Sequence, residues 1–329
     1  RRARIVVIGG GTGLSTLLRG LKNYHFDITA IVTVADDGGS SGRLRDDYDI
    51  PPPGDIRNVI AALSKVEPLV EEMFQYRFKS SSGLDGHSLG NLMLAALTEI
   101  TGDFSHAISE MSKVLNVNGR VLPAANKKVT LHAKLNDGSI ITGESKIPNA
   151  SYPIDYVFLE PDGVHALPAA IRHIKRADYI LIGPGSLYTS IIPNLLVKEI
   201  GDAVVASEAH KLYICNLMTQ QGETLHYTAS DHVNAIHAHV GQQFIQSILV
   251  NDADSVAVPE TIKESYLEKN AEPVHFDIQN LNSMGIHVLK RDIATIIDGV
   301  VRHNATNVAE FLHEYVYELT EDKIDGFES

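Results

Sequence analysis

Two glycine-rich turns occur in the first 42 residues, and each follows a run of β-branched residues. The first turn is GGGTG at residues 9–13. It stands between the apolar run IVVI and a segment whose leucines recur at the spacing of one helix face. The N–H groups and the dipole at the start of a helix favour an anion. We therefore expect a phosphate group to lie against Gly10, Gly11, Thr12 and Gly13.

This turn matches neither of two common phosphate-binding templates. The pattern GxxxxGK[ST] requires a lysine, and none occurs before Lys22. The dinucleotide pattern GxGxxG would place its third glycine at Leu14 or at Thr16, depending on where it starts. A tight turn that only packs the helix on the strand is the structural alternative.

The second turn is DDGGSSG at residues 36–42, after the apolar run at residues 28–34. In a doubly wound sheet the carboxyl ends of the strands meet at the edge where ligands bind. One acid here could accept a hydrogen bond from a ribose hydroxyl, or both could share Mg²⁺ with phosphates. A solvated turn is the alternative, because Asp, Gly and Ser are common in turns. The candidate nucleotide-binding residues are Asp36, Asp37, Ser40 and Ser41, with Asp37 also the candidate metal ligand.

Two further segments place polar side chains at expected helix starts. Asp55, Arg57 and Asn58 follow three prolines, and Arg57 would offer phosphate a planar fork while Asp55 could cap the helix. His87 and Asn91 lie at the start of a later helix, where they could contact a sugar or could simply cap the helix.

The second half of the chain adds a third turn, GPGS, after the apolar strand ADYILI. Its N–H groups could serve a second phosphate or the base, and a purely structural turn is the alternative. The candidates here are Gly183, Gly185 and Ser186. Asn216 could read a pyrimidine edge because an amide both donates and accepts. Tyr266 could stack on a base and Arg302 could face the phosphates, although either could equally be a surface residue.

The elements that would position these residues alternate between buried strands and amphipathic helices, which predicts a three-layer α/β fold with a doubly wound, mostly parallel, Rossmann-like sheet. Later strands are expected at residues 179–182, 212–216, 248–250 and 293–297. Residues 127–161 break the rhythm, because period-two alternation on both sides of NDG predicts a β-hairpin. We expect one domain over residues 1–329 with this hairpin as an excursion.

Composition narrows the function further. The formal charge of −13 argues against nucleic acid as a partner, because nucleic-acid binders usually carry a basic face. No apolar run is long enough to span a membrane, and a single cysteine, Cys215, fits a reducing cytoplasm and an inert buried thiol. The histidines at 226, 232, 237 and 239 lack metal-site spacing and indicate a surface helix instead.

Six ordered blocks of the chain resemble the gluconeogenesis-factor family, often called YvcK: GGGTG…LLRGLK, VTVADDGGSSGRLR, PPPGDIRN, GHSLGN, NGRVLPAAN and GPGSLYTSIIPNLL. That family belongs to the superfamily of the phospholactate transferase of deazaflavin biosynthesis, CofD. The resemblance implies a nucleotide-sugar binder with UDP-N-acetylglucosamine as ligand, needed for gluconeogenic growth and for cell shape. The transferase relatives use Mg²⁺ and carry aspartates around a segment that reads LPAAN here, with Asn126 in place of a carboxylate.

We therefore expect a cytoplasmic regulator that binds a nucleotide sugar, forms a homo-oligomer and acts on a protein partner that the sequence does not name. An Mg²⁺-dependent transferase of a nucleotide-activated metabolite is the first alternative, supported by the aspartate pair and opposed by Asn126. An NAD(P)-binding protein is the second alternative, supported by the position of Asp36 and opposed by the missing third glycine.

Overall fold

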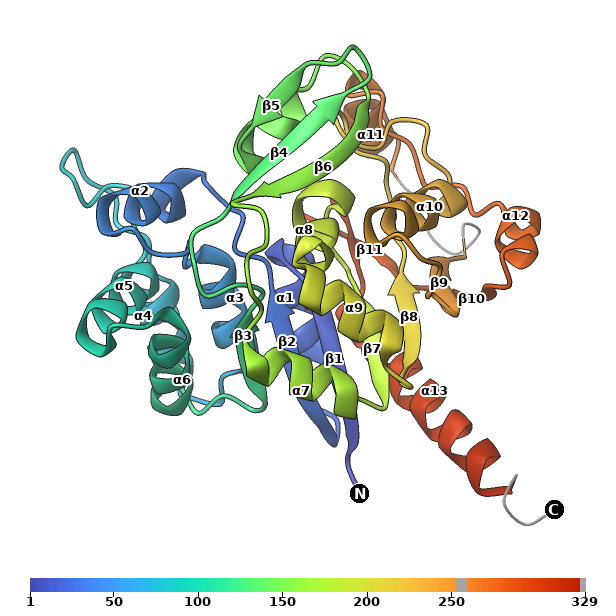
Figure 1. The fold of residues 1–329 in the computed structure, drawn as a ribbon, viewed down its shortest axis with the longest axis horizontal. Coiled ribbons are helices and arrows are strands. Elements are labelled where there is room, and N and C mark those ends of the chain that lie inside the picture. The colour runs from blue at the N-terminus through green and yellow to red at the C-terminus, as the bar shows by residue number, and fades with distance from the viewer. Residues whose placement is uncertain (253–258, 326–329) are drawn as a thin grey trace.

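The computed structural model describes residues 1–252 and 259–325 of the chain. Its centre is a seven-stranded sheet with the order β10-β9-β8-β7-β1-β2-β3, in which every neighbouring pair is parallel (Figure 1). The strands are β1 (Ala3–Gly9), β2 (Phe26–Val32), β3 (Arg120–Pro123), β7 (Tyr179–Ile182), β8 (His210–Ile214), β9 (Ser247–Asn251) and β10 (His287–Arg291). The predicted doubly wound α/β fold is confirmed.

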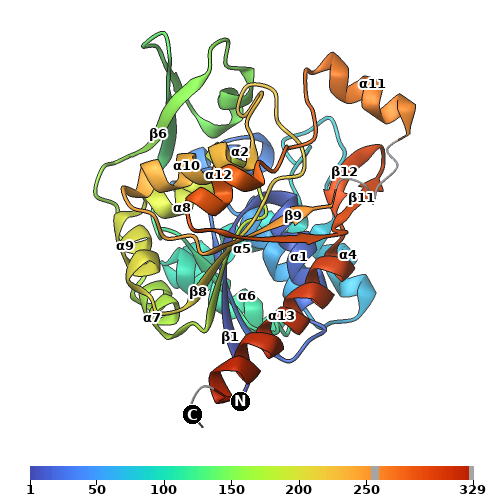
Figure 2. The same ribbon diagram turned by 90° about the vertical axis from the view of Figure 1, so that its right-hand side faces the viewer.

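Helices cover both faces of the sheet, which explains why the central strands are apolar on both sides. Helices α7 (Pro168–Arg176), α8 (Ile192–Leu196) and α9 (Lys198–Ala206) cover one face. Helices α1 (Gly11–Leu21), α3 (Gly54–Leu63) and α13 (Ala305–Asp325) pack together on the other, and Figure 2 shows the two groups on opposite sides of the strands. Ile5, Val6, Val7 and Ile8 of β1 are consequently almost fully buried.

The remaining helices lie around this core. Between β2 and β3 the chain forms α2 (Gly39–Tyr48), α3, α4 (Pro68–Gln75), α5 (Leu89–Thr101) and α6 (Phe104–Val114). After β7 come the short π-helix η2 (Leu187–Ile191), α10 (Ala229–Val240), α11 (Glu260–Glu268) and α12 (Ile278–Ser283). Among the residues that the structure describes, no helix is long and apolar enough to cross a bilayer.

The order of the strands defines the place where a ligand should bind. The chain builds β1, β2 and β3 outward in one direction, then returns to place β7 against the other side of β1 and continues outward through β10. The direction of winding therefore reverses between β1 and β7. In open α/β sheets, ligands bind outside the carboxyl ends of the strands at this point of reversal.

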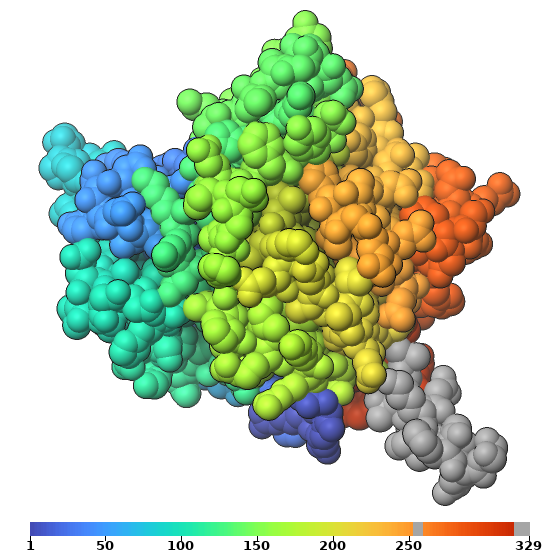
Figure 3. All heavy atoms as spheres, in the orientation of Figure 1, coloured from blue at the N-terminus to red at the C-terminus, as the bar shows by residue number. Residues whose placement is uncertain are grey.

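The predicted hairpin at residues 127–161 is part of a three-stranded antiparallel sheet. Strand β4 (Thr130–Leu135) pairs with β5 (Ile140–Thr142) across the predicted turn, and with β6 (Ile154–Glu160) on its other side. The 3-10 helix η1 (Glu144–Asn149) connects β5 to β6. This insertion rises above the carboxyl edge of the main sheet in Figure 1, and Figure 3 shows it as a ridge on the surface.

Three strands differ from the sequence-based expectation. The strand expected at residues 293–297 is β11 (Ala294–Ile297), which lies outside the main sheet and pairs antiparallel with β12 (Val300–His303). The seventh strand of the main sheet is instead β10, whose sequence HVLKR carries only one buried residue and gives a weak pattern. Strand β3 is similarly short, with an exposed arginine at its start, and was not predicted.

Candidate functional site

A cleft of about 420 Å³ opens at the carboxyl edge of the sheet, where the turns after β1 and β7 meet. Its inner wall comprises residues 10–13 of the first turn, and Gly185 and Ser186 of the third. Its outer wall comes from the loop after β8, at residues 217–220, from α11, and from β12 at residues 300–303. The first and third predicted glycine turns therefore lie side by side and form one wall of the cleft, at the reversal point between β1 and β7.

Gly10 and Gly11 of the first turn, the two glycines that open the cleft, could not be replaced without strain. A Cβ atom at Gly10 would lie 2.5 Å from Cγ2 of Thr33 and 3.2 Å from a carboxylate oxygen of Asp55. Gly11 has a φ of +66°, a conformation that costs an L-residue about 1–2 kcal/mol. Helix α1 begins at Gly11, whose N–H is accepted by the Asp55 carboxylate, and its N-cap residue Gly10 has no side chain that could accept from the next N–H groups, which lie in residues that line the cleft. This geometry suits an anion.

The third turn is held to the end of β8 by Asn216, and it also touches the first turn. The Asn216 side-chain nitrogen donates to the Gly185 carbonyl at 2.7 Å, and its oxygen accepts from the Tyr213 hydroxyl at 2.6 Å. A Cβ atom at Gly185 would lie 3.2 Å from the Gly10 carbonyl oxygen, so the two turns touch. Asn216 lines the cleft, but its amide is occupied within the protein and supports the turn. Gly183 lies behind Gly185 and does not line the cleft.

Asp55 connects the first turn to helix α3. Its carboxylate accepts the backbone N–H of Gly11, and burial followed by the charge of Asp36 raises the Asp55 pKa to about 6. The prediction that Asp55 caps α3 is wrong, because Pro53 occupies the cap position and makes no side-chain hydrogen bond. Asp55 lies one residue inside the helix, where its side chain reaches the glycine turn instead.

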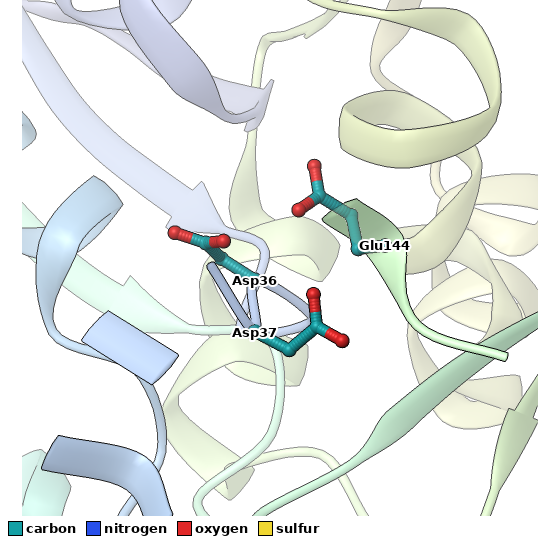
Figure 4. A group of neighbouring side chains, drawn as sticks. All are labelled: Asp36, Asp37 and Glu144. Atoms are coloured by element: carbon teal, nitrogen blue, oxygen red, sulfur yellow. The ribbon is translucent and has the colours of Figure 1, made fainter. Parts of the chain in front are cut away.

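Near Asp55, three carboxyl groups gather from distant parts of the sequence, and none of them lines the cleft (Figure 4). Asp36 and Asp37 follow β2, whereas Glu144 begins η1 of the insertion. Asp36 accepts the N–H of Gly38 at 2.9 Å, and Asp37 accepts the N–H of Ser145 at 2.9 Å. One oxygen of each acid lies within 4.8 Å of the others, and in the described part of the chain these three form the one such group.

The electrostatics of this group favour a bound proton or cation. Burial and the neighbouring charge of Asp36 raise the Glu144 pKa well above its usual value, and Asp36 also forms a hydrogen bond with Glu144. Like charges at this distance disfavour full ionisation, so one proton is shared. In an Mg²⁺ octahedron, ligand oxygens are about 3–4 Å apart, so the group could take the ion after a small closing movement.

Glu144 is a site residue that the sequence did not reveal, and residues 217–220 of the outer wall were not predicted either. It lies 107 residues beyond Asp37, in an insertion whose pattern indicated only a hairpin. The glycine at the neighbouring position 143 is the one sequence feature that relates to the acidic group. A side chain there would collide with Asp37, because a Cβ atom would lie 2.3 Å from its carboxylate oxygen. Glycine commonly follows a strand wherever the chain turns, so Gly143 points to the acidic group only once the fold is known.

Arg57 was predicted to bind phosphate, and the structure shows each of its three guanidinium nitrogens donating to a side chain within the protein. Its Nη1 donates to Oγ of Ser88 at 2.9 Å and to the Asn91 amide oxygen at 2.6 Å. Its Nε donates to the Gln75 amide oxygen at 2.6 Å, and Nη2 to that of Asn58 at 3.2 Å. Burial lowers the Arg57 pKa to about 10. Arg57 therefore ties α3 to α4 and α5 and does not line the cleft.

The predicted contacts from His87, Asn91 and Ser40 belong to the same buried network. Asn91 donates to Oγ of Ser40 at 3.0 Å, and Ser40 pairs with Nδ1 of His87 at 2.6 Å. Ser41 is also buried, and a Cβ at Gly54 would lie 2.3 Å from its Oγ. These side chains fix the start of α2 against α3 and α5, so their contribution to the cleft is to position the aspartate turn.

Two weaker predictions place residues on the outer wall of the cleft. Tyr266 of α11 lines it, and its hydroxyl accepts the N–H of Val301 at 2.9 Å, which joins α11 to β12. Arg302 of β12 also lines the cleft, with an exposed side chain. Both residues therefore face the space opposite the glycine turns.

The histidines were expected on a surface helix, and that expectation is wrong for most of them. His232 and His237 are buried in α10, and Nε2 of His237 accepts the N–H groups of Phe244 and Ile245. His239 accepts the N–H of Val157 at 3.0 Å, whereas His226 is exposed and precedes the helix. Cys215 is buried as predicted, just after β8, and burial raises its thiol pKa.

Asn126 also has a structural task. Its side-chain oxygen accepts the N–H of Ser105 at 2.9 Å, and its nitrogen donates to Asp103 at 2.6 Å. Asp103 caps helix α6, so Asn126 fixes the start of that helix.

The strand order and the glycine turns at its reversal point define a doubly wound, Rossmann-like class of α/β protein. The chain belongs to the CofD family, because the family model described as 2-phospho-L-lactate transferase CofD matches residues 5–294.

Named relatives agree with this assignment. A gluconeogenesis factor of Bacillus subtilis is 58% identical over 318 residues, which cover 97% of this chain and 99% of that protein. A gluconeogenesis factor of Halalkalibacterium halodurans is 54% identical, covering 95% of this chain and 97% of that protein. Two crystal structures of a Bacillus halodurans protein, one described as a UPF0052 family member, superpose with TM-scores of 0.91 and 0.90. Each is 55% identical and covers 94% of this chain and 99% of that one.

Proposed function

We propose that the cleft binds the diphosphate of a nucleotide sugar, with UDP-N-acetylglucosamine as the ligand. In this proposal the protein is a regulator of carbon metabolism that is needed for gluconeogenic growth and for cell shape. The observation that carries the proposal is the meeting of two glycine turns at the reversal point between β1 and β7. Backbone N–H groups there can hold a diphosphate without any lysine. The names of the relatives support the metabolic role.

The dimensions of the cleft suit such a ligand. A cleft of about 420 Å³ lies within the usual range of roughly 300–1,000 Å³ for small-molecule sites. In this arrangement the diphosphate lies on residues 10–13, and the base lies against the outer wall near Tyr266. Arg302 would then contribute positive charge from the side opposite the turn.

We further propose that Mg²⁺ accompanies the ligand on Asp36, Asp37 and Glu144. All three offer carboxylate oxygen, the ligand type that this ion prefers. A divalent cation would replace the proton that Glu144 holds, and it would remove the repulsion between the acids. The ion supplies charge neutralisation for the phosphates, while the N–H groups of Gly38 and Ser145 orient the two aspartates.

A second candidate is an Mg²⁺-dependent transferase that acts on a nucleotide-activated metabolite. The acidic group favours it, because Glu144 supplies a third carboxyl where the sequence had suggested only two. The family description favours it as well. Against it, the carboxamide of Asn126 is fully engaged with Asp103 and Ser105, so that position provides no base.

Calorimetric titration with UDP-, GDP- and adenine-dinucleotide ligands, with and without Mg²⁺, tests the proposal. At one hundred times Kd, binding stabilises the fold by about 2.7 kcal/mol. For 329 residues this corresponds to a rise in melting temperature of roughly 4 °C. A regulator returns the ligand intact after overnight incubation. Release of UMP or UDP in proportion to protein would favour the transferase, and a response to NAD alone would favour a dinucleotide binder.

A further inference from the structure

A second hollow lies at the opposite edge of the sheet, below the amino ends of β1, β2 and β3. Its volume is about 160 Å³. The polar residues that line it come from four elements: Arg4, Asp27, Thr29, Arg120, His173 and Arg176. Arg4 and Gly9 are the near and far parts of β1, so the hollow and the cleft are separated by roughly 17 Å of strand.

The charges around this hollow do not cancel. Arg120 is paired with Asp27 at 2.8 Å, the single carboxylate among the lining residues. Arg4 shares Asp178, which lies outside the lining, with Arg1. Arg176 has no hydrogen bond or ion pair within the residues that the structure describes, and neither has the ring of His173. The three lining arginines therefore meet two carboxylates, Asp27 and Asp178, which leaves an excess of positive charge at this hollow in a chain whose formal net charge is −13.

Two neutral groups complete the hollow. Thr29 is 2% exposed and its oxygen accepts from Arg120 at 3.3 Å, which leaves its own proton free to donate. Burial, and then the charge of Arg120, lower the His173 pKa and favour its neutral ring.

We propose that this hollow is an anion site that takes the phosphate group of a small metabolite or free phosphate. Planar guanidinium groups match phosphate oxygens in pairs, and a phosphate would supply the missing negative charge. The volume of about 160 Å³ accepts a phosphate with a few further atoms but not a nucleotide. The site is separate from the nucleotide cleft and does not depend on the function proposed for it.

The test uses calorimetric titration of the full chain with inorganic phosphate and with glycerol 3-phosphate, at constant ionic strength in chloride. Arg176→Gln should weaken binding at this site at least tenfold. Lys175→Gln is the matched control, because it removes the same charge from the neighbouring exposed position, which does not line the hollow. Tighter binding of the phosphomonoester would identify a metabolite, and equal binding would identify free phosphate.

Two further measurements separate this site from the cleft. Binding should persist in Gly11→Ala, whose added methyl group lies in the cleft. In NMR titrations phosphate should raise the pKa of His173 in the parent protein and leave it unchanged in Arg176→Gln. Equal effects of Arg176→Gln and Lys175→Gln, complete loss of phosphate binding in Gly11→Ala, or binding of acidic polypeptides but not phosphate would each overturn the proposal.

Discussion

Glu223 is a buried carboxyl group that should make the stability of the protein depend on pH. It is 7% exposed and lies in the loop after β8, whose residues 217–220 form the outer wall of the cleft. It accepts from the Thr189 hydroxyl at 3.4 Å and from the N–H of Tyr188, both in η2. Burial raises its pKa from 4.5 to about 7.

The sign of the effect follows from proton binding. Between about pH 4.5 and 7 the unfolded chain loses this proton while the folded chain keeps it, so stability falls as pH rises. Each pKa unit corresponds to about 1.36 kcal/mol, which makes the total loss about 3 kcal/mol. The loss is complete above pH 7 and absent below about pH 4.5.

Glu223→Gln removes the charge and keeps an oxygen that can accept from Thr189. We expect it to stabilise the protein by up to about 3 kcal/mol at pH 8, or roughly 4 °C in melting temperature. At pH 4 its effect should nearly vanish. Chemical unfolding followed by circular dichroism at both pH values measures this, with the exposed Glu208→Gln as control. Destabilisation at pH 8, or an equal change at both pH values, would refute the reasoning.

Three other substitutions test the cleft. Gly11→Ala should lower the free energy of unfolding by about 1–2 kcal/mol because of the positive φ at this position. It should also abolish nucleotide binding while the circular dichroism spectrum stays native. A variant that binds with the parental affinity would show that the turn is purely structural. Asp37→Asn should weaken nucleotide binding at least tenfold in Mg²⁺ and leave it unchanged in EDTA. The local structure should be kept, because the amide oxygen can still accept from the N–H of Ser145. Equal affinities of the variant and the parent protein in Mg²⁺ would exclude the metal role. Asp55→Asn should stabilise the protein at pH 8 by about 2 kcal/mol, a value reduced for partial exposure. Its effect should be much smaller at pH 4, close to the ordinary pKa of 3.8, where the unfolded chain still holds part of the proton. Unfolding midpoints that differ equally at both pH values would contradict this.

The sequence predicted the parts of the fold that depend on local patterns. Buried strands such as β1 and β7 are continuous apolar runs, and a glycine turn between a strand and a helix has few alternatives. Of the residues that line the cleft, the sequence therefore predicted those of the first and third glycine turns, Tyr266 and Arg302.

The rest depends on contacts between distant segments. Arg57 has the same sequence signature whether it binds phosphate or amides, and only the packing of α3 against α5 decides between them. Glu144 reaches Asp36 through an insertion whose orientation no local pattern encodes. Strand β10 was missed because an edge strand needs few buried residues, and His232 and His237 were misassigned because neutral histidines are tolerated in a core.

Hydrogen exchange with saturating UDP-N-acetylglucosamine and Mg²⁺ tests the central claim most directly, because it reports where the ligand lies. We predict protection of the amides at the start of α1, residues 10–16, and of the turn at residues 183–190, with smaller protection at residues 36–42. The amino ends of the strands should be unaffected. Protection confined to other segments, or an absence of protection in the first and third glycine turns, would contradict the assignment of this cleft as the nucleotide site.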